Sequence, residues 1–314
     1  MTRFDILVVG GGLAALTAGL FATRAGRSTL VLEPAMPGGH ITTIPKIEDF
    51  PGFPDGVSGY ELGPNAQMQA MNAGAEFAMA EVQSLARVAG SSSGDWLVTT
   101  TEGDYEAGAV IVASGSHARA LAVPGEERLV GKGVSHCASC DGPLFRGQHV
   151  AVAGGGDSAL QEALTLAEYV GKVTIFHRGE AFSAQQTYQQ RVQDERKIEA
   201  CHNTDILEIV GDAEVSGVRV QDRGSGTERT VEVVGLFVYV GLEPNSRFLD
   251  GVLTLDADGK IPTDIWMRTD QAGLFAAGDV RKDSASQAIT AAGDGATAAI
   301  AADRYLTARE AASG

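Results

Sequence analysis

Short apolar runs alternate with helical stretches along the chain, and glycines separate them. An apolar run at residues 6–9 leads into three glycines and an Ala/Leu-rich stretch that reaches about Gly26. This pattern predicts a strand, a tight turn and a helix, and a second apolar run at 28–32 predicts another strand. Strands that alternate with helices in this way are typical of a parallel α/β sheet.

The same alternation continues to the end of the chain. Residues 34–60 are rich in Gly and Pro, and we expect this irregular connection to be a functional loop that contacts a cofactor. Further elements are expected as a helix at 61–73, a strand from 74 toward Val82, strands within 95–113, a strand at 148–153 followed by a helix, a strand at 172–176, a helix and short strands within 185–222, a strand at 233–241, a buried strand at 273–280 and a helix from about 286 to 306.

The opening pattern occurs twice. Gly10-Gly11-Gly12 after the first strand and Gly154-Gly155-Gly156 after the strand at 148–153 both fit G-x-G-x-x-A, and the offset between them also relates Glu33 to His177. The glycines allow a pyrophosphate to approach the backbone, and the free N–H groups of the following helix stabilise its charge. The sequence therefore predicts two dinucleotide-binding domains.

The two copies differ where each second strand ends. Glu33 can accept hydrogen bonds from ribose hydroxyls and would repel a 2′-phosphate, so the first copy suits FAD or NAD. The second copy has His177 and Arg178 there instead. A cation favours a 2′-phosphate and hence NADPH over NADH, although Arg178 could also be a solvated residue at a strand end.

Between the copies lies Cys137-Ala-Ser-Cys140-Asp141, which contains two of the three cysteines. So close a pair in a chain with few cysteines indicates a redox-active dithiol or a metal site. A structural zinc site usually draws on a second Cys or His pair. Cys201, with the scattered histidines, is a poor candidate for one, so no metal is expected and Cys201 is interpreted as an unpaired packing residue. Asp141 is a candidate acid/base for thiol exchange, or a capping or turn residue.

Composition narrows the function classes. The 314 residues are 44% hydrophobic, enough for two cored domains, and the formal net charge of −16 argues against nucleic acid as a partner. No apolar run is long enough to span a bilayer, and the first strand begins too early for a signal peptide. We expect a cytoplasmic protein with no membrane association.

With these motifs in order, the chain resembles the low-molecular-weight, bacterial-type thioredoxin reductases over essentially its full length. The segments that carry the resemblance are Gly10–Gly12, Gly38-Gly39 through Phe50-Pro51-Gly52, Cys137–Asp141, Gly154–Ala159, and Phe275–Asp279 with Gln287-Ala288.

The resemblance implies an α/β fold of two Rossmann-like, three-layer (ββα) dinucleotide-binding domains, the second inserted into the first. Residues 1–116 and 247–314 would bind FAD, and residues 117–246 would bind NAD(P) and carry the dithiol. The chain would cross between them near 116–119 and 243–245. A homodimer and a rotation between the domains are also implied.

Motifs and resemblance together assign residues to each site. Asp279, at the carboxyl end of a buried strand, would bind a ribityl hydroxyl of FAD, or serve as a helix cap. The catalytic residues would be Cys137, Cys140 and Asp141. The residues assigned to FAD are Gly10, Gly12, Leu13, Ala14, Glu33, Gly38, Gly39, His40, Ile41, Thr42, Asp49, Val82, Ala113, Ser114, Gly115, Gly278, Asp279, Gln287, Ala288 and Ile289. Those assigned to the pyridine nucleotide are Gly154, Gly156, Asp157, Ser158, Ala159, His177 and Arg178.

The expected reaction passes electrons from NADPH through FAD to the Cys137–Cys140 disulfide, with Cys140 facing the flavin, and on to thioredoxin or a similar small disulfide protein. Departures from the family pattern keep the donor open. Gly179 and Ser183 stand where the family usually has arginines for the 2′-phosphate, Ser286 replaces another arginine, and His40 replaces a glutamine beside the flavin. The alternatives are a reductase fed by ferredoxin or another flavin donor, a flavin dithiol oxidase of a small molecule, and a non-enzymatic redox sensor.

Overall fold

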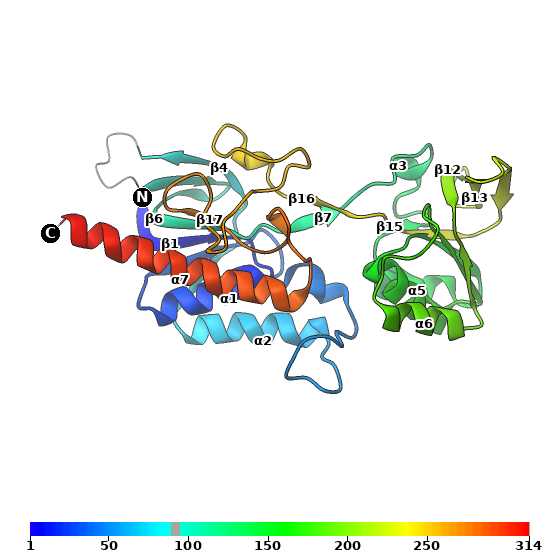
Figure 1. The fold of residues 1–314 in the computed structure, drawn as a ribbon, viewed down its shortest axis with the longest axis horizontal. Coiled ribbons are helices and arrows are strands. Elements are labelled where there is room, and N and C mark those ends of the chain that lie inside the picture. The colour runs from blue at the N-terminus through cyan, green and yellow to red at the C-terminus, as the bar shows by residue number, and fades with distance from the viewer. Residues whose placement is uncertain (89–94, 314) are drawn as a thin grey trace. The chain divides into compact units, whose positions relative to one another are not determined.

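The structure is a computed structural model that describes residues 1–88 and 95–313 (Figure 1). It divides into two compact units, Met1–His117 with Glu243–Gly314, and Ala118–Leu242. The first unit resumes at Glu243 rather than at residue 247, because Asn245 bonds within it. The Asn245 N–H donates to the carbonyl of Gly115 at 3.0 Å. The crossing segments, β7 (Ser116–Ala118) and β16 (Leu242–Pro244), pair with each other.

A sheet with a parallel centre forms the middle of the first unit. Its order is β3-β2-β1-β6, with β17 also parallel to β6 and the antiparallel strands β5 and β4 continuing from the other half of β6. The strands are β1 (Thr2–Val9), β2 (Thr29–Leu32), β3 (Glu76–Ala78), β4 (Val82–Arg87), β5 (Trp96–Thr100), β6 (Gly103–Val112) and β17 (Leu274–Ala276).

Alternation along β1 explains the layers of the first unit. Ile6 and Val8 pack toward the helices, whereas Leu7 and Val9 pack in the cluster that includes residues of β4 and β5. Figure 1 shows α1, α2 and α7 lying beside one another, and a Cβ on Gly295 of α7 would overlap the Ala14 carbonyl of α1. The helical segments are α1 (Leu13–Arg24), η1 (Gly39–Thr43), α2 (Gly59–Asn72), η3 (Arg247–Leu249), η4 (Gly278–Val280) and α7 (Ala288–Ser313).

The second unit repeats this arrangement. Its parallel sheet has the order β11-β10-β9-β15-β8, which corresponds strand by strand to β3-β2-β1-β6-β17, and a separate antiparallel sheet has the order β12-β13-β14. The strands are β8 (Val134–Ser135), β9 (His149–Gly154), β10 (Lys172–Phe176), β11 (Ile198–Cys201), β12 (Thr204–Val210), β13 (Gly217–Asp222), β14 (Glu228–Val231) and β15 (Gly235–Tyr239). The helical segments are α3 (Glu126–Leu129), α4 (Ala138–Asp141), η2 (Gly142–Phe145), α5 (Asp157–Tyr169) and α6 (Gln186–Asp194).

The predicted α/β class with two dinucleotide-binding domains is confirmed. Three predicted elements were wrong in extent. The strand expected at 273–280 is only β17, and its last residues form η4 because the chain turns after Ala277. The strand expected from 74 toward Val82 is broken, because β3 ends at Ala78 and Val82 begins β4 with a different neighbour. The last helix continues to Ser313 rather than stopping near 306, because its later turns still bury Leu306 and hold Arg309 against Asp95.

Candidate active site

The first glycine motif forms the turn between β1 and α1. Gly10 has φ +111°, and a Cβ there would overlap the carbonyl oxygen of Ala113, so the turn accepts only glycine without a backbone shift. Gly12 caps α1 without any side-chain hydrogen bond, and a Cβ on it would meet nothing within 4 Å. The amino end of α1 is therefore open to an anionic ligand, as a bound pyrophosphate requires.

Glu33 follows β2 and lies across the glycine turn. A Cβ on Gly11 would come within 2.6 Å of the Glu33 side chain, and the Ala35 N–H donates to Glu33 Oε1 at 3.0 Å. The half-buried carboxylate thus has a fixed position beside the open helix end. This position fits a residue that accepts hydrogen bonds from an adenosine ribose.

The Gly/Pro-rich loop docks on the same turn. The Gly38 N–H donates to the Gly11 carbonyl at 2.7 Å, and Thr42 Oγ1 donates to the carbonyl of Gly39 at 2.8 Å. One apolar cluster then brings the loop, α1 and α7 together, and it includes Leu13, Ile41 and Ala288. The structure thereby gathers predicted FAD residues from three distant parts of the sequence.

Asp279 lies in η4 directly after β17 and is half-buried. Burial raises the pKa of this carboxyl, which the positive fields of His40 and Lys260 oppose, and Ser284 Oγ donates to it at 3.5 Å. A buried acid with so weak a protein donor retains capacity to accept a hydroxyl group. The FAD residues present therefore fit the cofactor at both the pyrophosphate and the ribityl positions.

The remaining residues assigned to FAD have mixed surroundings. Ser114 Oγ donates to the Asn245 carbonyl at 2.7 Å, so the end of β6 is tied to the returning chain. The Val82 side chain belongs to the buried core, which leaves only its backbone for a ligand. Asp49 is exposed, and Ile289 is 41% exposed at the first turn of α7. Their assignment stays a prediction.

The second glycine motif reproduces the first in detail. A Cβ on Gly154 would overlap the Tyr239 carbonyl, and one on Gly155 would overlap the ring of His177, as on Gly10 and Gly11. Gly156 caps α5 without a side-chain hydrogen bond. Asp157 Oδ1 accepts from the Gln185 N–H at 2.7 Å, which fixes the first residue of α5.

His177 and Arg178 lie where the second copy would bind a ribose. His177 is held by its Nε2 contact with the Ala181 carbonyl at 2.9 Å and by the Phe182 ring at 5.4 Å. Arg178 is exposed, and within residues 1–88 and 95–313 its guanidinium has no protein partner. Ser183 Oγ instead donates to the Gly155 carbonyl at 3.3 Å. The cation next to His177 is thus available to a phosphate.

The two cysteines of the motif form a disulfide in the second unit. Cys137 precedes α4, and its Sγ accepts the N–H of Cys140 at 3.2 Å and contacts Ser139 Oγ at 3.4 Å. Cys137 is half-buried and Cys140 is exposed. These hydrogen bonds stabilise a thiolate on Cys137 better than one on Cys140, because only the Cys137 sulfur has a described N–H donor.

Asp141 ends α4 and is held by Ser135. The Ser135 hydroxyl donates to Asp141 Oδ2 at 2.6 Å and accepts the N–H of Cys137 at 3.1 Å. Asp141 also stands at the N-cap position of η2, but its side chain makes no capping hydrogen bond there. Its half-buried carboxyl remains next to Cys140 for proton transfer.

A second acid, for which the sequence gives no signal, lies at this motif. Glu162 of α5 is 7% exposed, and its Oε2 accepts the N–H of Ala138 at 3.2 Å. Burial raises the pKa of Glu162 to about 7. A motif search could not find it, because Glu162 is 24 positions from Ala138 and only the packing of α5 under α4 joins them.

Comparison with known proteins shows the family. A profile described as pyridine nucleotide-disulphide oxidoreductase matches residues 4–295. A thioredoxin reductase of Treponema pallidum is 39% identical over 305 residues, which cover 97% of this chain and 98% of that protein. A bifunctional thioredoxin reductase/thioredoxin of Mycobacterium leprae is 41% identical, and this chain spans 66% of its length. The crystal structure of Lactococcus lactis thioredoxin reductase superposes with a TM-score of 0.94 at 36% identity, covering 97% of this chain and 99% of that one.

The chain belongs to the thioredoxin reductase family. Membership confirms the predicted resemblance and agrees with the Cys137–Cys140 disulfide.

In this family member, Cys201 is free and half-buried, and burial raises the pKa of its thiol. No group of three or more His, Cys, Asp or Glu side chains capable of holding a metal occurs among residues 1–88 and 95–313. Within the same ranges no helix is long and apolar enough to cross a membrane.

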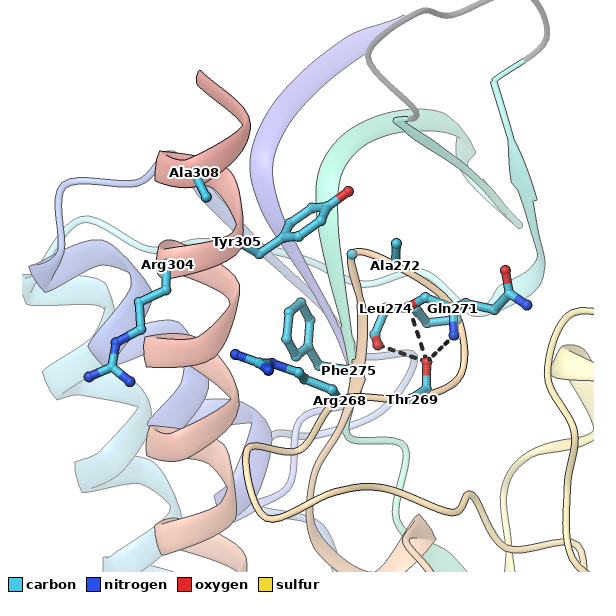
Figure 2. A pocket seen from close by; sticks show the side chains of 10 residues that line it. Arg268, Thr269, Gln271, Ala272, Leu274, Phe275, Arg304, Tyr305 and Ala308 are labelled. Carbon is cyan, nitrogen blue, oxygen red and sulfur yellow. Dashed lines mark hydrogen bonds between the residues drawn. The ribbon is translucent and has the colours of Figure 1, made fainter. Parts of the chain in front are cut away.

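A pocket of about 360 Å³ in the first unit of this thioredoxin reductase family member lies away from the site residues. Figure 2 shows Phe275 of β17 and Tyr305 of α7 facing it, with Arg268 and Arg304 in its lining. The Thr269 hydroxyl donates to the Leu274 carbonyl at 2.8 Å and shapes the adjoining turn. None of the residues assigned to a nucleotide or to the dithiol lines this pocket, so we do not include it in the candidate active site.

Proposed function

We propose that this protein reduces the disulfide of thioredoxin or a similar small disulfide protein, using NADPH as electron donor and FAD as resident cofactor. The observation that carries the proposal is the Cys137–Cys140 disulfide in a unit that has its own nucleotide-binding turn, together with a second such turn in the other unit. When bound, FAD supplies two-electron transfer between a nicotinamide and a disulfide.

The protein's own residues explain the thiol chemistry. Cys137 attacks the partner's disulfide as a thiolate, which the Cys140 N–H stabilises, and a mixed disulfide forms as the partner's other sulfur leaves. Cys140 then attacks Cys137 to release the reduced partner. Asp141, oriented by Ser135, gives or takes the proton at the sulfur that leaves or attacks. Cys140 is also the sulfur that we assign to the flavin side.

The proposed cofactor sites follow from the two turns. In the first unit, the open end of α1 and Glu33 bind the adenosine diphosphate part of FAD, and Asp279 accepts from its ribityl chain. In the second unit, the open end of α5 binds the NADPH pyrophosphate and Arg178 binds the 2′-phosphate. The flavin site and the disulfide belong to different units, and the rotation between domains that the resemblance implies would present the nicotinamide and the disulfide to the flavin in turn.

An anaerobic titration tests the donor. We expect NADPH to bleach the flavin absorption of the purified holoprotein in a stopped-flow instrument, and NADH to do so more slowly. Addition of oxidised thioredoxin should then restore the flavin colour over many turnovers. Failure of NADPH to bleach a protein that contains FAD would overturn the NADPH proposal.

The anaerobic titration should also include donors other than NADPH, because Gly179 and Ser183 supply no cation to the 2′-phosphate site. Reduced ferredoxin or another flavin donor would then bleach the flavin where NADPH does not. Oxygen uptake with peroxide release from a small dithiol would instead indicate a dithiol oxidase. Bound FAD without multiple turnover by any donor would indicate a redox sensor.

We also propose that the protein works as a cytoplasmic homodimer with no nucleic acid or membrane partner. Its family membership and the net charge of −16 support this assignment. Light scattering after size-exclusion chromatography would give the mass, and a mass of one chain at micromolar concentration would contradict the dimer.

A further inference from the structure

Glu162 differs from the other carboxylates that the described part of the chain buries. Asp95 accepts from Arg3 and Arg309, and these cations lower its pKa, while Asp294 accepts from Arg281 at 2.9 Å. Glu126 accepts two backbone N–H groups at 2.8 and 2.6 Å. Glu162 has neither a cation nor two short N–H bonds, so its ionised form is poorly compensated.

The hydrogen-bond partners of Glu162 belong to the cysteine motif and to the end of β15. The N–H of Ala138, between the two cysteines, is shared between Glu162 Oε2 at 3.2 Å and the Tyr239 hydroxyl at 3.2 Å. Tyr239 in turn donates to Glu162 Oε2 at 3.5 Å from the end of β15. The carboxyl is therefore one backbone amide away from Cys137.

A second acid, Asp141, acts on the same tyrosine as Glu162. Burial raises the pKa of Tyr239, and the negative charges of Glu162 and Asp141 raise it further, so Tyr239 stays neutral. From the elements packed on α5, the groups that act on Glu162 are the Tyr239 hydroxyl and the Ala138 N–H. Opening the disulfide to leave a Cys137 thiolate would add another anion to a motif that ends in the Asp141 carboxyl and packs on the Glu162 carboxyl of α5. Protonation of Glu162 removes one of these charges.

We propose that Glu162 is a positioning residue for the dithiol that takes up a proton when the Cys137–Cys140 disulfide is reduced, and so stabilises Cys137 as the attacking thiolate. The inference rests on the proposed reductase function. Two electrons break the S–S bond, and one proton goes to the Cys140 sulfur and one to Glu162. A dithiol donor supplies both protons, whereas a reduced nicotinamide would supply one with its hydride and solvent would supply the other. When Cys137 attacks the partner's disulfide, the first partner thiolate takes a proton from solvent. The Cys140 proton then passes to the second partner thiolate as Cys140 attacks Cys137 and the disulfide closes again, and Glu162 returns its proton to solvent.

The test is an equilibration of the FAD-loaded full chain with mixtures of reduced and oxidised dithiothreitol between pH 6 and 8.5. Acid quenching, alkylation and mass spectrometry give the fraction of open disulfide. In the wild type, the equilibrium constant for reduction should rise up to about tenfold per pH unit below pH 7, because a proton is released to solvent. Above pH 7 it should become nearly constant, because Glu162 keeps that proton.

Glu162→Gln keeps an acceptor oxygen but has no carboxyl to titrate. The equilibrium constant for reduction of its disulfide should therefore continue to rise with pH above pH 7, without a break. Glu168→Gln, an exposed acid on the same helix, is the matched control and should keep the wild-type break. Tyr239→Phe removes a donor to the carboxylate and should move the break to higher pH. Coincident profiles for wild type and Glu162→Gln would overturn the proposal.

A measurement on the wild type alone covers the case in which Glu162→Gln does not fold. Reduced-minus-oxidised infrared spectra at pH 8 should show the band of a newly protonated buried carboxyl, and its absence would also overturn the proposal. Both experiments use dithiothreitol and no nucleotide or thioredoxin. Their failure is therefore distinguishable from failure of the reductase proposal, which the NADPH titration tests.

Discussion

Each cysteine of the motif has a distinct environment, and this predicts what single substitutions do. Cys137→Ser and Cys140→Ser should each lower NADPH-dependent turnover of oxidised thioredoxin by at least about 10³-fold, because no intramolecular disulfide can form. FAD content should not change, since the FAD residues lie in the other unit. Cys201→Ser, at the free cysteine of the same unit, is the matched control and should keep full turnover. Full turnover by either motif variant would contradict the catalytic assignment.

Arg178 carries the predicted preference for a 2′-phosphate. Arg178→Gln should raise the KM for NADPH about tenfold or more, the size of a lost hydrogen bond to a charged group, and leave the KM for NADH nearly unchanged. Arg196→Gln, at another exposed arginine of this unit, should change neither value. Steady-state kinetics with both nucleotides checks this, and equal changes for NADPH and NADH would show that Arg178 does not read the phosphate.

Single residues were predictable from the sequence where a local pattern fixes their role. Cys137 and Cys140 are close in sequence, and Glu33 and His177 follow from the glycine turns by strand length alone, so their placement required no tertiary information. Glu162 has no such pattern. The sequence around Glu162 predicts only an amphipathic helix, and the burial of Glu162 arises because α5 packs against α4.

Among the elements, η4 depends on a buried ion pair that the sequence did not indicate. Asp294 of α7 accepts the Gly278 N–H at 3.1 Å and Arg281 Nε at 2.9 Å, and both charged side chains are largely buried. Asp294→Asn leaves Arg281 uncompensated and should lower the free energy of unfolding by about 3 kcal/mol. Urea denaturation of the apoprotein measures this directly. Asp264→Asn, at an exposed pair with Arg268, should change it by less than about 1 kcal/mol, and an equal effect of both variants would contradict the argument.

Element types were more predictable than their ends and contacts. The apolar runs gave β1, β2, β9 and β10, because buried parallel strands read as continuous hydrophobic stretches. Gly295 lies in an alanine-rich helix, and only the structure shows that its lack of a side chain lets α7 contact the backbone of Ala14. The break between β3 and β4 depends on which neighbour each strand pairs with, and residue preferences do not encode that choice.

The division of the whole chain into two units rests on separate cores. In the described ranges, every cluster of buried apolar residues has all its members in one unit. The clusters that contain Leu7 and Ile6 lie in the first unit, and those that contain Val152 and Ala151 lie in the second. The chain crosses where β7 pairs with β16, and His117 Nδ1 lies 2.7 Å from Asn245 Oδ1, so the two ends of the first unit are held together without the inserted segment.

Replacing residues 118–242 by a short Gly/Ser linker should therefore leave a folded first unit. We expect a yellow protein with stoichiometric FAD and a cooperative thermal transition, because the open end of α1, Glu33 and Asp279 all remain. It should not reduce thioredoxin, since the disulfide is gone. Residues 118–242 expressed alone should retain the Cys137–Cys140 disulfide and bind NADPH in a calorimetric titration. A deletion protein that is folded but colourless would place FAD elsewhere, whereas an unfolded one would show that the first unit's core requires the insert.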